Sequence, residues 1–149
     1  MLIFAAFTIK INMIKRQQIK ELLKSTDFNT GVTVMGWVKT FRNNQFIALN
    51  DGSCMGNIQV VVDFNNTEEN LLKRITTGAA IKATGILVES LGKGQSVEIK
   101  ATEVEILGDS DPEKFPLQPK KHSLEFLREI AHLRFRTNTV NAVFKVRHA

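Results

Sequence analysis

Between residues 31 and 107 the chain alternates apolar and polar residues in five short segments that are separated by turn residues. The first segment places Val32, Val34 and Val38 at even positions, with other residue types between them. Successive side chains of a β-strand point to opposite faces, so a period of two predicts half-buried strands. An amphipathic helix would instead need apolar residues three and four apart. We therefore expect a small β-rich domain.

The order of the segments restricts the fold further. Strands are predicted over residues 32–42, 45–50, 57–63, 80–88 and 97–107. A helix is predicted between the third and fourth strands, with Thr67 as its cap, acidic residues in its first turn and basic residues in its last. Three strands, a helix and two strands is the order of the OB-fold, a five-stranded Greek-key barrel. Other small α+β domains share this order.

Two local signals refine the strand prediction. Gly36 lies inside the first strand and predicts a bend or bulge there. Asn43 and Asn44 predict a turn after it, and residues 51–53 (Asp-Gly-Ser) predict a tight hairpin between the second and third strands. We expect the second and third strands to be antiparallel neighbours.

The segments outside the barrel read differently. Residues 14–25 have helical spacing, with lysines and arginine on the remaining faces, which either contact solvent or lie beside a nucleic acid. Residues 109–121 contain three prolines and predict a linker. Ser123 is expected to cap a helix with apolar rows reaching to Leu133, and a further helix begins near Val140. We expect a barrel followed by a helical hinge.

Composition limits the classes of function. A formal charge of +5 is compatible with a polyanionic partner without proving one. The single cysteine, Cys54, excludes a disulfide framework and a cysteine-based metal cluster, and we expect an idle thiol in a reducing cytoplasm. Residues 1–12 are too few to cross a bilayer and lack the charged start of a signal peptide, so no membrane partner is expected.

Strand parity suggests a binding face. If Ile47 and Leu49 point into the barrel, Phe46 points outward, and by the same rule Gln59 points outward from the third strand. Arg42 reaches this face from the end of the first strand. A stacking aromatic, an amide and an arginine suit single-stranded RNA. The alternative is a reversed register in which Phe46 belongs to the core.

The residues of this face carry a resemblance to a known family. Residues 36–61, GWVKTFRNNQFIALNDGSCMGNIQVV, resemble the anticodon-binding OB domain of aspartyl-, asparaginyl- and lysyl-tRNA synthetases. Residues 115–138, FPLQPKKHSLEFLREIAHLRFRTN, are similar to the hinge of the asparaginyl enzymes. The resemblance covers the chain from residue 14 to its end.

The resemblance implies specific roles. Phe46 would stack on the central anticodon uridine, Gln59 would contact the edge of that base, and Arg42 would lie beside the anticodon backbone. Lys93, in the loop between the fourth and fifth strands, would flank the same site. For Trp37 we expect packing in the barrel rather than stacking on RNA. The implied partner is the anticodon loop of the asparagine tRNA.

The resemblance also implies a domain organisation and an activity. Residues 1–12 would be a disordered extension, 13–108 the OB-fold domain, 109–139 the hinge, and 140–149 the start of a catalytic domain. The full-length enzyme would be a cytoplasmic homodimer that joins asparagine to its tRNA with ATP and Mg²⁺, whereas this part alone would hold no cofactor and no activity. No catalytic residue or metal ligand is predicted here, and His122, His132 and His148 form no catalytic set.

Two alternatives remain open at this level. One is a freestanding OB-fold module that binds single-stranded nucleic acid without any enzyme, and the other is part of an aspartyl-tRNA synthetase. The GxG of Gly92 and Gly94 does not favour a dinucleotide site, because no strand-to-helix transition follows it.

Overall fold

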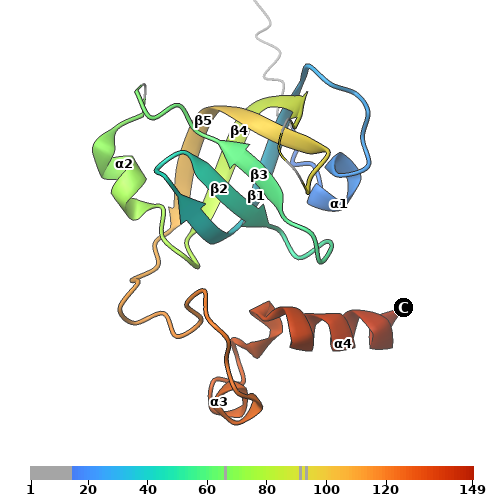
Figure 1. Ribbon diagram of the computed structural model, residues 1–149, viewed down its shortest axis with the longest axis vertical. Coiled ribbons are helices and arrows are strands. Elements are labelled where there is room, and N and C mark those ends of the chain that lie inside the picture. The colour runs from blue at the N-terminus through green and yellow to red at the C-terminus, as the bar shows by residue number, and fades with distance from the viewer. Residues whose placement is uncertain (1–14, 66, 91, 93) are drawn as a thin grey trace, which may run out of the picture.

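A computed structural model describes residues 15–65, 67–90, 92 and 94–149. Five strands form a closed barrel in the order β1-β2-β3-β5-β4, and the chain then leaves the barrel for a small helical segment (Figure 1). The strands are β1 (Thr30–Arg42), β2 (Phe46–Asn50), β3 (Ile58–Val61), β4 (Ala80–Glu89) and β5 (Val97–Gly108). The predicted OB-fold is confirmed.

Barrel closure depends on one parallel pair. β3 and β5 run parallel, with Gln59 beside Glu98 and Val61 beside Lys100, whereas all other neighbouring strands are antiparallel. A closed barrel leaves no unpaired strand edge, which removes a site of aggregation. This pairing joins strands that are far apart in the sequence.

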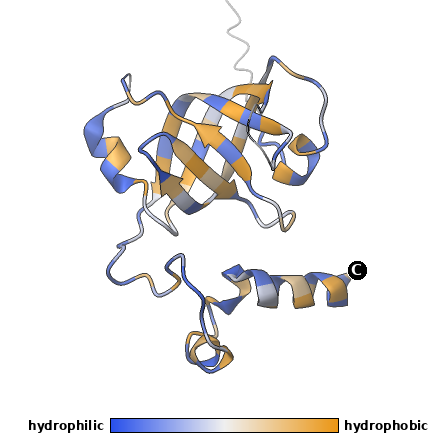
Figure 2. Cartoon of the chain, in the orientation of Figure 1, coloured by the Kyte–Doolittle hydropathy of each residue, from blue (hydrophilic) through white to orange (hydrophobic). Residues whose placement is uncertain are grey.

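The barrel interior follows the predicted alternation. Strand hydropathy alternates along the ribbons (Figure 2), and the inward residues form one buried cluster. Val32, Val34 and Val38 are each at most 1% exposed, and Ile47 and Leu49 are fully buried. At roughly 25 cal/mol per Å² of buried apolar surface, this cluster is the main source of barrel stability.

Gly36 allows β1 to pass close to the backbone of Asn50 in β2. A Cβ atom at this position would lie 2.6 Å from the carbonyl oxygen of Asn50, so no side chain fits. The pairing of β1 with β2 shifts register two residues later, between Val38 and Thr40. The irregularity predicted from Gly36 therefore occurs where β1 passes from β4 to β2.

The N-terminal helix is shorter than predicted. Only α1 (Ile19–Leu22) is helical, and its N-cap Gln18 makes no side-chain cap bond. Asp51 takes the place of a cap, because its carboxylate accepts a hydrogen bond from the Ile19 N–H at 3.0 Å. Residues 15–18 have no regular secondary structure, and the Gln17 N–H donates to the Thr33 carbonyl at 2.9 Å. Tertiary contacts with the barrel thus replace helical hydrogen bonds in this segment.

The connection between β2 and β3 differs from the predicted tight hairpin. It spans residues 51–57, and the Asp51 carboxylate also accepts hydrogen bonds from the Ser53 N–H and the Ser53 hydroxyl. Asn50 holds the other side of the loop by donating to the Gly56 carbonyl at 2.8 Å. The loop is therefore longer than the tight turn that the Asp-Gly signal predicts, and the hydrogen bonds of Asn50 and Asp51 stabilise it.

The predicted helix between β3 and β4 is confirmed, but the prediction that Thr67 caps it is wrong. α2 (Glu69–Arg74) begins after Glu68, and Thr67 instead donates from its hydroxyl to the Asp63 carbonyl at 2.7 Å. The charge pattern is as predicted, with acid in the first turn and base in the last.

Residues 109–149 form the segment that we call the hinge segment. It contains the predicted linker, α3 (Leu124–Glu129), the 3-10 turn η1 (Arg134–Arg136) and α4 (Asn138–His148), and it lies below the barrel in Figure 1. Ser123 caps α3 as predicted, since its hydroxyl accepts from the Phe126 N–H. The helix ends before the predicted apolar rows are complete, and Leu127 is its only buried residue. None of the described helices is long and apolar enough to cross a membrane.

Candidate nucleic-acid interface

The outward residues of the barrel form two adjacent rows. In the first row Arg42 of β1 pairs with Phe46 of β2, Phe46 with Val61 of β3, and Val61 with Lys100 of β5. Phe46 is half-buried, whereas its neighbour Ile47 is fully buried. The predicted parity of β2 is therefore confirmed, and the alternative with a core Phe46 is excluded.

A turn of two asparagines sets the first row. Asn43 and Asn44 have φ values of 54° and 51°, in the left-handed region that asparagine tolerates better than most residues. The Gln45 N–H closes the turn on the Arg42 carbonyl at 3.1 Å. The turn returns the chain so that Arg42 and Phe46 face each other. An arginine thus lies beside an outward aromatic ring, as a stacked base and its phosphate require.

The second row contains the amide. Ala48 pairs with Gln59, and Gln59 pairs with Glu98. The Gln59 Nε2 donates to the Glu98 carboxylate at 3.2 Å, and the Ser90 hydroxyl donates to the same oxygen at 3.2 Å. With its NH₂ group engaged by Glu98, Gln59 keeps its Oε1 as a hydrogen-bond acceptor. An acceptor suits a base edge that carries an N–H donor, as uracil and guanine do.

A hollow of about 500 Å³ lies over this row. Arg42, Ala48 and Gln59 contribute to its wall, together with Asn57 and the loop residues Gln95 and Ser96. The small side chain of Ala48 leaves room for a ligand above β2, while Phe46 lies beside the hollow in the first row. The hollow offers a cation and amides to a ligand, and Phe46 presents its ring in the neighbouring row without lining the hollow.

Comparison with known proteins gives the family. Residues 32–107 match the tRNA anti-codon family, which is described as an OB-fold nucleic acid binding domain. The chain belongs to this family.

Relatives of this OB-fold nucleic acid binding domain are longer proteins. An asparagine–tRNA ligase of Parabacteroides distasonis is 59% identical over 91% of the chain, and one of Bacteroides fragilis is 55% identical over the same share. The chain spans about 30% of the length of these curated relatives. Only 108 residues precede the hinge segment, so a match over 91% of the chain must include much of that segment.

Solved structures share the fold. The crystal structure of asparaginyl-tRNA synthetase from Pyrococcus horikoshii has a TM-score of 0.75 and 24% identity, and covers 91% of this chain and 33% of that one. Aspartyl-tRNA synthetase from Entamoeba histolytica has a TM-score of 0.70 with 17% identity, over 99% of this chain and 38% of that one.

In this OB-fold domain, sequence reasoning missed two outward residues of β5. Lys100 adds a second cation to the row of Phe46, and Glu98 orients Gln59. Their outward position is readable from the strand alternation, but the parallel pairing of β3 with β5, which brings them beside Gln59 and Val61, has no local sequence signal. Lys93, which was predicted to flank the site, lies outside the described residues.

Trp37 does not pack inside the barrel as predicted. Its side chain is 39% exposed, and the Arg136 guanidinium lies 4.5 Å from the centroid of its ring. Trp37 therefore joins the outside of β1 to the hinge segment through a cation–π contact.

His122 and Cys54 make local contacts in the structure. His122 stacks on Phe126 and contacts the Gln118 carbonyl through Nε2. Cys54 is partly exposed and contacts the Gly56 carbonyl. No group of three His, Cys, Asp or Glu side chains suited to a metal ion occurs in the described part of the chain.

Proposed function

We propose that this chain is the part of an asparaginyl-tRNA synthetase that reads the anticodon loop of the asparagine tRNA. The observation that carries the proposal is the shared outer face of Phe46, Arg42 and Gln59 on the β1–β2–β3 surface. Phe46 stacks on the central uridine, and Arg42 and Lys100 neutralise phosphates on either side of the ring. Gln59, held by Glu98, accepts a hydrogen bond from the uracil N3–H.

The proposed whole protein joins asparagine to this tRNA with ATP and Mg²⁺, as a cytoplasmic homodimer. Its chemistry would belong to the two thirds of the relatives' length that this chain does not cover. Support comes from relatives named asparagine–tRNA ligase and from the match through the hinge segment, which a freestanding OB-fold module does not need. An aspartyl enzyme is disfavoured because the asparagine ligases are 55–59% identical over nearly the whole chain.

Phe46→Ala tests the stacking role. The variant removes an outward ring, so its melting temperature should change little, whereas affinity for an anticodon stem-loop should fall by about 1–3 kcal/mol. That loss equals roughly 5- to 150-fold in Kd. Thermal unfolding and fluorescence anisotropy measure the two effects.

Phe144→Ala is the matched control, because Phe144 is also a partly exposed phenylalanine (43%) but lies on α4. Its RNA affinity should equal that of the unaltered chain. Strong destabilisation by Phe46→Ala, with unchanged affinity per folded molecule, would disprove the stacking role.

The synthetase context has a separate test. A protein of the relatives' full length should catalyse asparagine-dependent exchange of pyrophosphate into ATP, and the 149-residue chain alone should not. Exchange by a clean preparation of this chain would show that the catalytic residues lie within these 149 residues, contrary to the proposal.

A further inference from the structure

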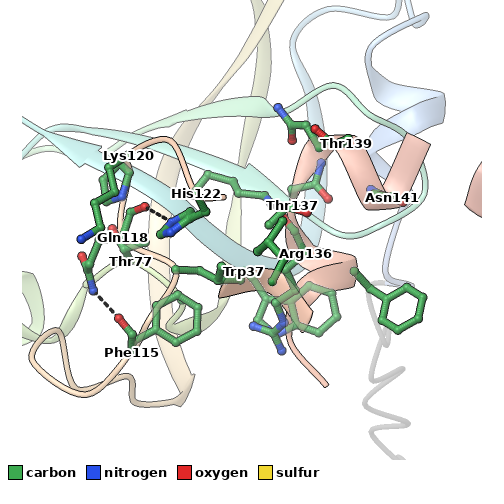
Figure 3. Close-up of a pocket in the computed structure, with 18 of the residues that line it drawn as sticks. Trp37, Thr77, Phe115, Gln118, Lys120, His122, Arg136, Thr137, Thr139 and Asn141 are labelled. Atoms are coloured by element: carbon green, nitrogen blue, oxygen red, sulfur yellow. Dashed lines mark hydrogen bonds between the residues drawn. The ribbon is translucent and has the colours of Figure 1, made fainter. Parts of the chain in front are cut away.

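A second cavity, of about 610 Å³, lies between the barrel and the hinge segment. Figure 3 shows Lys120 and His122 of the linker on one side of it, Thr137 and Thr139 at the start of α4 on the other, and Arg136 beside Trp37. This cavity is separate from the hollow over Gln59, with which it shares no lining residue.

The charge of this cavity is one-sided. Its described lining includes Lys39, Lys120, Lys121 and Arg136, and none of its lining residues is an aspartate or a glutamate. Five cations outside the cavity have carboxylate partners in the described part of the chain, among them Arg74 with Asp109. No ion pair with a carboxylate involves a cavity cation in the described part of the chain.

Two of these cations, Lys39 and Arg136, are partly buried neighbours. Lys39 is partly buried, and its Nζ donates to the Arg136 carbonyl at 2.6 Å. Burial and then the Arg136 charge lower the pKa of Lys39, and burial lowers the pKa of Arg136. Burial disfavours both protonated forms, the charge of Arg136 also disfavours that of Lys39, and an anion in the cavity would offset these effects.

The remaining wall can donate hydrogen bonds to the oxygen atoms of an anion. Thr139 and Asn141 add polar side chains, and no side chain caps the start of α4. The first turn of an uncapped helix presents free N–H groups and adds to the positive potential made by the lysines and Arg136.

We propose that this cavity binds a phosphate group through Lys39, Arg136 and the linker lysines Lys120 and Lys121. The phosphate comes either from an RNA backbone or from a free polyphosphate, since both present the same oxygens. The proposal goes beyond anticodon reading and does not depend on it, because the outer face of β2 takes no part.

The test is a titration of the chain with inorganic pyrophosphate, followed by two-dimensional NMR. We expect shifts centred on the Trp37 indole N–H and the amides of residues 136–139, and a rise in the pKa of Lys39. Loss of a charged hydrogen bond in Lys39→Met should weaken binding about tenfold. Lys120 and Lys121 are exposed, so their double methionine variant keeps the fold and provides a second test if Lys39→Met does not fold.

Lys82→Met is the control, since it removes a strand lysine that pairs with Glu105 and is absent from the cavity lining. It should leave pyrophosphate affinity unchanged. Equal losses in Lys82→Met and the cavity variants, or shifts spread evenly over all lysines, would overturn the proposal. If the cavity variants also weaken RNA binding and pyrophosphate competes with RNA, the source is the backbone; if RNA binding is unchanged, it is a free polyphosphate.

Discussion

The barrel buries a continuous cluster of aliphatic side chains, whereas the hinge segment buries only Leu117 and Leu127. Leu124 and Val146 of the hinge segment are 61% and 78% exposed. Apolar burial is the main source of folding free energy. The barrel is therefore stabilised by its own core, whereas the hinge segment depends on its contacts with the barrel.

Those contacts are mostly polar. Lys145 donates to the Gly52 carbonyl at 2.7 Å, Ser110 donates to the Thr77 carbonyl at 3.0 Å, and Arg136 stacks on Trp37. Exposed polar contacts each contribute little net free energy, so they orient a segment more than they stabilise it. The difference indicates that the barrel can present the face of Phe46 and Gln59, which we propose to bind RNA, independently of the position of the hinge segment.

The largest expected effect is in the barrel core. Leu49→Ala should lower the free energy of unfolding by about 2–5 kcal/mol, because it leaves a cavity among residues that cannot collapse into it. Chemical denaturation measures the loss. A value below about 1 kcal/mol would show that the barrel core does not dominate stability.

A smaller loss is expected at Asp51, which joins α1 to the barrel. Its side chain is 1% exposed and accepts hydrogen bonds from Ile19 and Ser53. We expect Asp51→Ala to lower the free energy of unfolding by about 1.5–3 kcal/mol in total, the range for loss of a charged hydrogen bond, and chemical denaturation measures the loss. Burial alone would raise the pKa of Asp51, but the hydrogen bonds from Ser53 and Ile19 and the charge of Arg16 outweigh it and lower the pKa.

This lowered pKa gives the sign of the pH dependence. The contribution of Asp51 is fully present above its unfolded pKa, near 3.8, and is lost as the pH falls through its lower folded value. Acid unfolding of Asp51→Ala should therefore begin at higher pH. Asp109→Asn is the control, because its ion pair with Arg74 is exposed to solvent and screened, so its loss should change stability little. Equal effects of the two variants would contradict the role of Asp51.

The smallest effect is expected in the hinge segment. Val146→Ser should change the free energy of unfolding by less than about 0.5 kcal/mol, since the side chain is already 78% exposed. Thermal unfolding checks this. A loss above about 1 kcal/mol would mean that the exposed face of α4 is covered in solution, and analytical ultracentrifugation would then show whether a second copy covers it.

The sequence by itself determined the five strands and the alternation of their faces, whereas burial in the structure decided that Phe46 points outward and Ile47 inward. The strands and their alternation follow from a period of two within each strand, which is local and survives an error of a residue at the strand ends. Ser123 as a cap and the charges of α2 are equally local. The roles of Phe46 and Gln59 in RNA binding remain predictions.

Only the tertiary structure decided which distant groups meet. It placed Asp51 at the start of α1, Lys100 and Glu98 beside β3, and Arg136 over Trp37. Each of these contacts joins residues at least thirty positions apart. The local sequence pattern around a charged side chain does not show which distant residue it contacts. Helix α1 is short because long-range contacts outweigh the small free energies of local helix preference. Trp37 lies outside because its neighbour Val38 points into the barrel, and successive side chains of a strand alternate between the two faces.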